Sequence, residues 1–501
     1  KSEWFNETEA VFQQVLDQVA LNLNEIHSVN YSTRYWNIFV GSWLQRFVHM
    51  VMFRIYEIEN HREISIATQN FSPANTLIEF ADLAKTPMFV ERLHAEVLEQ
   101  MNVFTSPSNT EKHSNNEQSR PNAKRNKGRT YVSATYLPRL NEVLLQLRLG
   151  RLPQKMNISR VLTVEINPRI REILRKTTGS MASGAEVTLA LLPMYMPCVY
   201  VEGYKPLFET SKPWKSKRHP KTIFTANRHL YDDVFNFWTA LAVESGSRLV
   251  VAQHGGNYGI SEFPSFAENH EALVADRYIT WGWKTEGPTY RGFAQPLIGR
   301  RLHSSWSKDS LLVITDQLWK YPRSIFSDMS ESSTYLDHLK STINGLQPEI
   351  RHNALLRIHQ AHQDAASSQI DWWKLHAPDI KQDLGDIDFE TRLNESRLLL
   401  IAHNGTSIPE AIALNAPTII TWSDSYMKVR KSAEAVFDAL EAAGVFHRTP
   451  ESAASFINLI WNDVDGWWNS PATIDARKQF TDQYARTVPN PVRFLAKALQ
   501  F

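Results

Sequence analysis

The sequence predicts an α/β fold of two Rossmann-like lobes that face one cleft, with a helical N-terminal region. Two apolar runs, 248–252 and 398–402, each end in a turn that contains glycine, and strand-length apolar runs alternate with helical segments from about residue 160 onward. Such alternation is typical of parallel sheets with right-handed crossovers. Ligands bind beyond the carboxyl ends of these strands, so the two turns are expected to line one cleft.

The bulk composition is that of a globular protein with more than one core. The chain has 501 residues, 43% of them hydrophobic and 21% charged, and a net charge of +1. Its length predicts two or three domains, and its charge gives no reason to expect a nucleic-acid partner. The single cysteine, Cys198, excludes a disulfide framework and is typical of a cytosolic protein. The apolar setting of Cys198 predicts an inert buried thiol.

The most apolar stretch of the N-terminal region, residues 36–56, is expected to be a buried or amphipathic helix. It carries Arg46, His49 and Arg54, which would be costly in the middle of a bilayer. Mean hydropathy is -0.36 and no long uncharged apolar run is present, so no transmembrane helix is predicted. Membrane association is therefore expected to be peripheral at most.

Periodicity assigns the remaining elements in order. Residues 8–23 and 34–59 have helical spacing, residues 105–129 are polar and predict a disordered loop, and residues 461–501 are helical and rich in aromatic side chains. The expected strands are 161–166, 221–226, 249–253, 278–281, 311–315, 355–359, 398–402 and 418–422, with helices between them.

The turn after residue 402 has the features of an anion site. It offers a flexible backbone and two hydroxyl groups, and Pro409 suits the first turn of the helix that follows. Such a helix start could bind a phosphate, with a carboxylate left for a ribose hydroxyl. A plain N-cap with a dipole-favoured acid is the alternative. The candidate nucleotide ligands of this turn are Asn404, Gly405, Thr406, Ser407 and Glu410.

Two further candidates end a neighbouring strand. Arg357 and His359 close the run 355–359, which lies beside this turn if the sheet is parallel. They could neutralise a nucleotide phosphate, or they could be a surface arginine and a structural histidine.

The first lobe brings a second group of candidates to its sheet edge. Asn227, Arg228 and Asp232 follow the strand 221–226, where a carboxylate could act as a base or a nucleophile on a sugar, or simply favour the helix start. His254 follows the next strand and could bind an anion, transfer a proton or hold the turn. The residues after it, Gly255, Gly256 and Asn257, favour close approach of the backbone to a ligand.

No metal site is predicted. The sequence has no Cys/His cluster with zinc spacing and no EF-hand pattern. Asp463 and Asp465 match a short metal-binding motif of another transferase fold, but they lie in a tryptophan-rich helical tail and not after a strand, so the match is attributed to chance.

Four segments together resemble a family of bacterial surface-carbohydrate transferases from O-antigen and capsule gene clusters. They are Tyr35–Leu44, the Gln-His-Gly-Gly turn Gln253–Gly259, the Trp-Gly-Trp segment Thr280–Trp283, and Asn404–Thr406 with Glu410. Within that family the chain looks most like the retaining β-Kdo transferase domains that use CMP-Kdo. The resemblance runs from about Tyr35 to Trp468 and skips the polar loop.

The resemblance implies a GT-B-like fold and a domain plan. Residues 1–300 would form the N-terminal acceptor lobe, residues 301–470 the nucleotide-binding lobe, and residues 471–501 a helical tail returning to the first lobe. Independently of the resemblance, the start of a new series of strands near residue 310 places the hinge between the lobes at 296–308. The family uses no metal and no cofactor besides its donor, CMP-Kdo. Its partners would be that donor and a glycan acceptor, lipid-linked or soluble, in the cytoplasm or at the inner face of the inner membrane.

The resemblance also implies roles for the first-lobe residues. Asp232 matches the aspartate that forms a glycosyl-enzyme adduct, which makes two displacements and retention the expected chemistry. The carboxylate of Kdo would be held by Arg228, His254 and the amides of Gly255 and Gly256. Two rivals stay open: a polyol-phosphate transferase that uses a CDP-alcohol with His254 as base, and a non-catalytic glycan-binding module.

Overall fold

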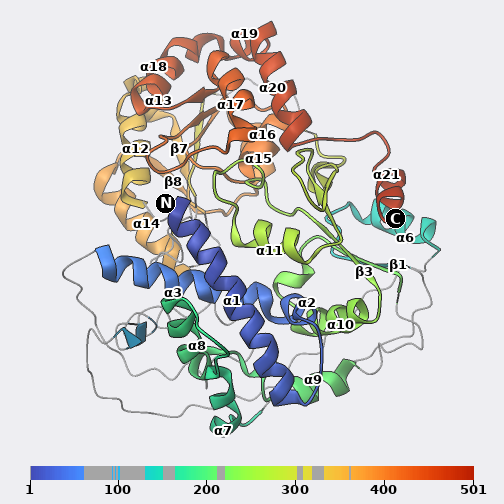
Figure 1. The fold of residues 1–501 in the computed structure, drawn as a ribbon. Helices are drawn as coiled ribbons and strands as arrows, with labels where there is room; N and C mark the ends of the chain where they lie inside the picture. Colours follow the sequence, from blue (N-terminus) through green and yellow to red (C-terminus); the bar gives the residue numbers. More distant parts are fainter. Residues whose placement is uncertain are drawn as a thin grey trace.

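The structure is a computed structural model with two parallel β-sheets, each in its own lobe (Figure 1). It describes residues 2–60, 93, 96, 97, 100, 101, 130–150, 164–211, 220–301, 309–316, 318, 332–359 and 363–500. The predicted polar loop 105–129, part of the predicted strand 161–166 and part of the hinge 296–308 lie outside the described residues. The two sheets confirm the predicted fold class.

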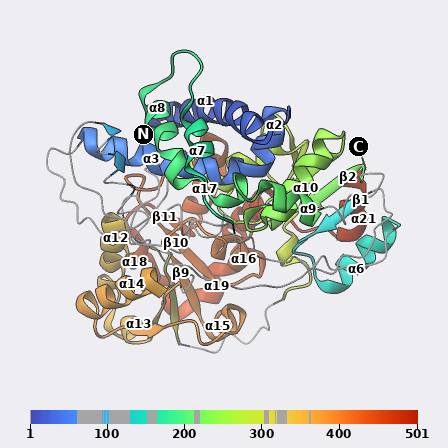
Figure 2. The same cartoon turned by 90° about the horizontal axis from the view of Figure 1, so that it is seen from below.

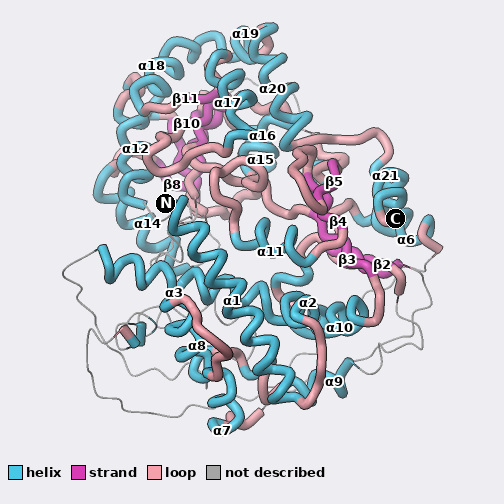
Figure 3. Tube along the Cα trace, in the orientation of Figure 1, coloured by secondary structure: helices cyan, strands magenta, loops and turns pink. Residues whose placement is uncertain are grey.

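The first sheet has five strands in the order β1-β2-β3-β4-β5, and every pair in it is parallel. The strands are β1 (Thr130–Ser133), β2 (Thr222–Thr225), β3 (Arg248–Ala252), β4 (Arg277–Thr280) and β5 (Thr289–Arg291). Figure 3 shows this sheet apart from the second one.

The second sheet has six parallel strands in the order β8-β7-β6-β9-β10-β11. This is the doubly wound order, in which the chain reverses its direction of winding between β6 and β9. The carboxyl ends of β6 and β9 therefore flank the switch point, where such sheets bind ligands. The strands are β6 (Leu311–Ile314), β7 (Ala354–Arg357), β8 (Lys381–Asp383), β9 (Leu398–Ile401), β10 (Thr418–Thr421) and β11 (Phe446–His447).

Helices surround both sheets. In the first lobe they are α1 (Ser2–His27), α2 (Thr33–Trp36), η1 (Asn37–Gly41), α3 (Ser42–Asn60), α6 (Arg139–Arg148), α7 (Pro168–Arg171), η3 (Glu172–Arg175), α8 (Ser183–Tyr195), η4 (Cys198–Tyr200), α9 (Tyr204–Ser211), η6 (Arg228–Leu230), α10 (Asp233–Glu244), α11 (Phe266–Val274) and η7 (Gln295–Leu297). In the rest of the chain they are α12 (Ser332–Asn344), α13 (Pro348–His352), α14 (Gln363–His376), α15 (Phe389–Glu395), α16 (Ser407–Ala413), α17 (Lys431–Ala442), α18 (Pro450–Ile460), η9 (Trp461–Asp463), α19 (Val464–Trp468), α20 (Pro471–Tyr484) and α21 (Pro491–Ala498).

Both faces of the first sheet are buried, because its strands alternate between two cores. Leu249 and Val251 of β3 belong to the large core that includes the N-terminal helices, whereas Val250 packs in a smaller core with Leu495 and Leu499 at the end of the chain. Helix α21 lies beside α6 over this second face (Figure 2). The C-terminal helix is thus part of the first lobe's layering.

The N-terminal helices form the outer layer of the first lobe. Trp36 and Trp43 are fully buried, and α3 packs against α1, α8 and α11. The polar residues of α3 that argue against a membrane span have partners: His49 pairs with Glu9 at 2.8 Å and Arg54 with Glu57. Among the described helices, none combines the length and the apolarity needed to cross a bilayer.

Candidate functional site at the lobe junction

The two glycine-bearing turns that stand out in the sequence touch each other in the structure. The N–H of Gly256, after β3, donates to Oγ1 of Thr406, after β9, over 3.0 Å. Nδ2 of Asn404 donates to the carbonyl of Asn257 at 3.3 Å and to Oγ of Ser261 at 2.8 Å. The carboxyl ends of a strand from each sheet therefore meet at one junction between the lobes.

Position 256 must be glycine because the contact leaves no room for a side chain. A Cβ on Gly256 would lie 2.5 Å from Cγ of Pro409 and 2.6 Å from Cα of Thr406. Both distances are far below van der Waals contact, and one partner is backbone, so a side chain would push the lobes apart. Gly256 therefore allows Thr406 and Pro409 of the second lobe to pack directly against the backbone of the first.

Further contacts extend the junction along residues 259–262. The N–H of Arg430, just before α17, donates to the carbonyl of Ile260 at 2.8 Å, and its Nη1 pairs with Oε1 of Glu268 at 2.9 Å. The other oxygen of Glu268 accepts from the N–H of Gly259. Burial raises the pKa of Glu268, and the charge of Arg430 opposes that rise.

Gln253 joins the Gln-His-Gly-Gly turn to the Trp-Gly-Trp segment. Its Oε1 accepts from the N–H of Trp281 and from Nε1 of Trp283, both at 2.8 Å, while its Nε2 donates to the carbonyl of Gly255. Gln253 is fully buried. The two sequence motifs are thus one structural unit that fixes the position of His254.

His254 belongs to a buried cluster centred on Glu271 of α11. Oε1 of Glu271 lies 3.0 Å from Nδ1 of His254 and 3.1 Å from Nε2 of His229, and Oε2 accepts from the hydroxyl of Tyr278 at 3.0 Å. The Glu271 side chain has no exposure and that of His254 is 19% exposed. A carboxylate that accepts from Nδ1–H holds the histidine with Nε2 as its basic nitrogen.

The charge state of Glu271 supports this arrangement. Burial alone would raise its pKa, but the charges and hydrogen bonds of His254 and His229 bring the pKa down to about 2. Glu271 is therefore an anion at neutral pH. Neither Glu271 nor His229 was among the sequence candidates; the only sequence signal was a pair of acids, Glu268 and Glu271, at helical spacing directly after the turn.

Asp232 lies three residues after His229, and Glu271 contacts both His229 and His254. Its Oδ2 accepts from Nε of Arg228 at 2.5 Å, and its Oδ1 accepts from the N–H of Phe235 at 2.9 Å as the N-cap of α10. The side chain is 1% exposed. Burial raises its pKa, and the charge of Arg228 opposes the rise.

Arg228 and Asn227 are engaged with β1 and the segment after it. Nη1 of Arg228 donates to Oγ of Ser133 at 2.9 Å, and Nδ2 of Asn227 donates to the hydroxyl of Tyr136. Nη2 of Arg228 is buried and has no hydrogen-bond partner among the described residues. One donor of this guanidinium is thus left without an acceptor among the described residues.

The second-lobe candidates divide into two groups. Arg357 donates from Nη1 to Oδ2 of Asp383 at 2.7 Å and to the carbonyl of Ile387 at 2.9 Å, so this nitrogen is occupied by the protein. His359 instead lies at the switch point, where its N–H donates to Oγ1 of Thr315, the residue after β6.

The turn after β9 is held from both sides. Oγ of Ser407 lies 3.2 Å from Nε2 of His403, and burial lowers the pKa of that histidine. Oε1 of Glu410 accepts from Nη1 of Arg300 at 2.8 Å, and Arg300 also pairs with Glu390. Burial raises the pKa of Glu410 against the effect of Arg300. Oε2 of Glu410 has no hydrogen-bond partner among the described residues.

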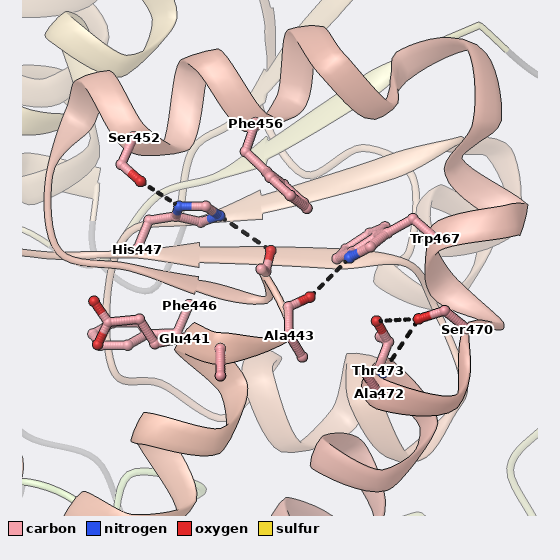
Figure 4. Close-up of a pocket in the computed structure, with 12 residues that line it drawn as sticks. Glu441, Ala443, Phe446, His447, Ser452, Phe456, Trp467, Ser470, Ala472 and Thr473 are labelled. Atoms are coloured by element: carbon pink, nitrogen blue, oxygen red, sulfur yellow. Dashed lines mark hydrogen bonds between the residues drawn. The ribbon is translucent and has the colours of Figure 1, made fainter.

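A separate pocket of about 380 Å³ lies beside β11, α18 and the start of α20. Figure 4 shows that its polar groups bond within the protein: His447 to Ser452 and Trp467 to the carbonyl of Ala443. No residue of the lobe junction lines it, so it is not part of the candidate site.

No group of three or more His, Cys, Asp or Glu in the described part of the chain could hold a metal ion. Asp463, whose match to a metal-binding motif is attributed to chance, accepts from the N–H of Gly466 at 3.0 Å and caps α19. That hydrogen bond gives Asp463 a local structural role.

These features are those of a two-lobed α/β protein whose candidate site lies where the two turns meet. The chain belongs to the LIC12162 family of transferases, whose model matches residues 2–499. No curated protein shows a significant match.

Two solved structures are similar at low sequence identity. One is described as a UDP-N-acetylglucosamine 2-epimerase from Listeria monocytogenes, with 11% identity, a TM-score of 0.36, and coverage of 60% of this chain and 77% of that one. The other is WaaG, a glycosyltransferase involved in lipopolysaccharide biosynthesis, with 11% identity, a TM-score of 0.33, and coverage of 74% and 99%. Neither score is high enough to indicate an activity for this chain.

The close contact at Gly256 gives a direct test of the junction. Replacing Gly256 by alanine should lower the free energy of unfolding by about 1–3 kcal/mol, because the added methyl group overlaps Thr406 and Pro409. It should also enlarge the molecule in small-angle X-ray scattering as the lobes separate. Gly255→Ala is the matched control, since its Cβ would come no closer than 3.1 Å to any of its neighbours, all of them side chains. Equal effects of the two variants would contradict this account of the junction.

Proposed function

We propose that this transferase is a retaining glycosyltransferase that moves Kdo from CMP-Kdo to a hydroxyl of a bacterial surface glycan. The observation that carries the proposal is the meeting of the two turns. The first-lobe turn that carries His254 contacts Thr406 at the ligand edge of the doubly wound second sheet, and Glu271 links His254 to His229, three residues before the buried Asp232. The donor, CMP-Kdo, is inferred from the resemblance of the same turns to β-Kdo transferases.

The nucleotide is assigned to the switch point of the second lobe. His359, the turn Asn404–Ser407 and Glu410 surround the carboxyl ends of β6 and β9. Backbone N–H groups and hydroxyls would hold the phosphate, and Oε2 of Glu410 would accept from a ribose hydroxyl. We assign no nucleotide contact to Arg357, because Asp383 and the Ile387 carbonyl already occupy its Nη1.

The acidic sugar is assigned to the first-lobe side of the junction. Its carboxylate would accept from Nη2 of Arg228 and from the amides of Gly255 and Gly256, with Asn257 and Asn227 at the rim of this group. The N–H of Gly256 donates to Thr406 in the structure, so binding a sugar there requires that this contact be exchanged.

Transfer would proceed by two displacements. In the first, an oxygen of Asp232 attacks the anomeric carbon, the bond from that carbon to the phosphate oxygen breaks, and CMP leaves with the electron pair. In the second, the acceptor hydroxyl attacks the same carbon, its proton passes to Nε2 of His254, and the ester bond to Asp232 breaks. Two inversions give net retention.

The protein environment fits these roles. The charge of Arg228 opposes the rise that burial causes in the pKa of Asp232 and so favours the ionised carboxylate, and the contact of Glu271 with Nδ1 of His254 leaves Nε2 as the basic nitrogen. No metal or additional cofactor takes part in this proposal. The cytoplasm, or the inner face of the inner membrane, is where such a nucleotide-sugar donor would be used.

The nucleophile is tested by Asp232→Asn. Asparagine can still cap α10, so the fold should persist, but its amide cannot form the adduct. Transfer from CMP-Kdo should fall by about a thousandfold or more, measured by CMP release in the presence of acceptor. Asp233→Asn is the neighbouring control, because Asp233 accepts from the hydroxyl of Tyr200 and is given no role in the reaction. Full activity of Asp232→Asn would refute the assignment.

The nucleotide site is tested by Glu410→Gln. Loss of a charge-assisted bond to ribose should cost about 1.5–3 kcal/mol, or roughly tenfold to a hundredfold in Kd for CMP, measured by calorimetry. Glu390→Gln is the matched control, since Glu390 pairs with the same Arg300 but lies outside the assigned site. If both variants weaken CMP binding equally, the effect comes from Arg300 and the ribose contact is wrong.

A further inference from the structure

Helix α6 exposes an unusual amount of apolar surface. Four of its side chains form what we call the apolar stripe: Leu140, Val143, Leu144 and Leu147, with exposed fractions of 70%, 37%, 46% and 51%. They occupy positions i, i+3, i+4 and i+7, so they form one face about 100° wide. Elsewhere in the described part of the chain, exposed aliphatic side chains are scattered singly among the elements. A contiguous exposed stripe marks an interaction surface.

The opposite face of α6 is the one that holds the helix to the protein. Leu145 has no exposure and belongs to the core that contains Leu495 and Leu499 of the chain end. Helix α21 lies against α6 there, and both helices stand at the outer edge of the first lobe in Figures 1 and 2. The stripe therefore points outward from a firmly packed helix.

Basic side chains border the stripe. Arg139 and Arg148 are exposed at the two ends of α6 and flank the apolar face on either side, and Arg493 and Lys497 are exposed on the adjacent α21. None of the four forms an ion pair with the described residues. An apolar stripe bordered by unpaired cations complements an anionic lipid surface, where the leucines enter the acyl boundary and the cations meet the headgroups.

Two partly exposed tyrosines lie near the candidate site, one of them three residues before α6 in the chain. Tyr136 and Tyr231 are 41% and 50% exposed, and they lie within electrostatic reach of each other. The hydroxyl of Tyr136 accepts from Asn227, the first residue of the turn that contains Asp232. Partly exposed tyrosines are favoured at the boundary between lipid and water.

We infer that α6 docks the protein on an anionic membrane surface and that the bound membrane presents a lipid-linked acceptor to the turn Asn227–Asp232. The docking follows from the stripe and its cations alone. The presentation of an acceptor rests on the proposed function.

Vesicle co-sedimentation tests the docking. The full chain should bind vesicles of phosphatidylglycerol and phosphatidylethanolamine and should bind phosphatidylcholine vesicles much less. The double variant Leu144→Glu with Leu147→Glu should bind the anionic vesicles about tenfold more weakly or worse, because charges cannot enter the acyl boundary. Leu375→Glu with Leu459→Glu is the matched control; both leucines are 77% exposed and lie on the second lobe.

Insertion of the stripe has a direct optical readout. Cys198 is buried, so a cysteine introduced as Leu144→Cys can be labelled selectively with a polarity-sensitive dye. Emission should shift to the blue on anionic vesicles, and the same dye on Leu459→Cys should not shift.

Three results would overturn the inference: no binding to anionic vesicles, equal binding by the α6 double variant, or a wild-type dimer that the double variant converts to monomer in analytical ultracentrifugation. The last would make the stripe an interface between copies. Vesicle binding is measured without donor or acceptor, so its outcome is independent of the proposed chemistry. Transfer to a water-soluble acceptor should be unchanged in the double variant.

Discussion

The close approach of two backbone turns at Gly256 and Thr406 is the constraint on which the rest of the site depends. It brings the carboxyl end of β3 in one sheet to the carboxyl end of β9 in the other, over a hydrogen bond of 3.0 Å. A methyl group at Gly256 would not fit. Because each turn follows a buried strand, neither can shift far without disturbing a core, and the positions of His254 and Asn404 are fixed relative to each other.

A second layer of buried polar groups gives the first-lobe turn its chemistry. Gln253 fixes the backbone, and Glu271 orients His254 while tying it to His229 and thus to the segment that carries Asp232. The Glu271 carboxylate accepts from two histidines and a tyrosine, and these contacts offset the cost of burying its charge. The proposed nucleophile and base are therefore set by helices α10 and α11, which pack on the same sheet.

Local pattern was sufficient to predict much of this arrangement. The apolar runs and glycines around residues 253 and 404 indicated both turns. Seven of the eight strands expected from periodicity overlap strands of the structure, namely β2, β3, β4, β6, β7, β9 and β10. The sequence did not reveal β1, β5, β8 or β11. Strand β8 is the polar Lys381–Asp383 and β11 has two residues, so neither has a period long enough to detect.

The candidate site was less accessible from the sequence, because its partners are distant in the chain. Nothing near Arg357 predicts its pairing with Asp383, and nothing near Asp232 predicts that its carboxylate caps a helix and binds Arg228 at once. Glu271 is 17 residues beyond His254 and becomes its partner only when α11 packs under the turn. Long-range packing decides these contacts, and a single sequence does not report it.

The most direct test of the central claim is the intact mass of the protein after mixing with CMP-Kdo in the absence of acceptor. A retaining transferase with Asp232 as nucleophile should gain the mass of one Kdo residue, and Asp232→Cys should trap the adduct more durably, since the thioether formed leaves less readily than an ester. Peptide mapping should place the added mass on the segment 227–233. No adduct in either protein, together with turnover of CDP-glycerol, would contradict the account and favour a CDP-alcohol transferase, and an adduct on any other segment would show that the catalytic centre lies elsewhere.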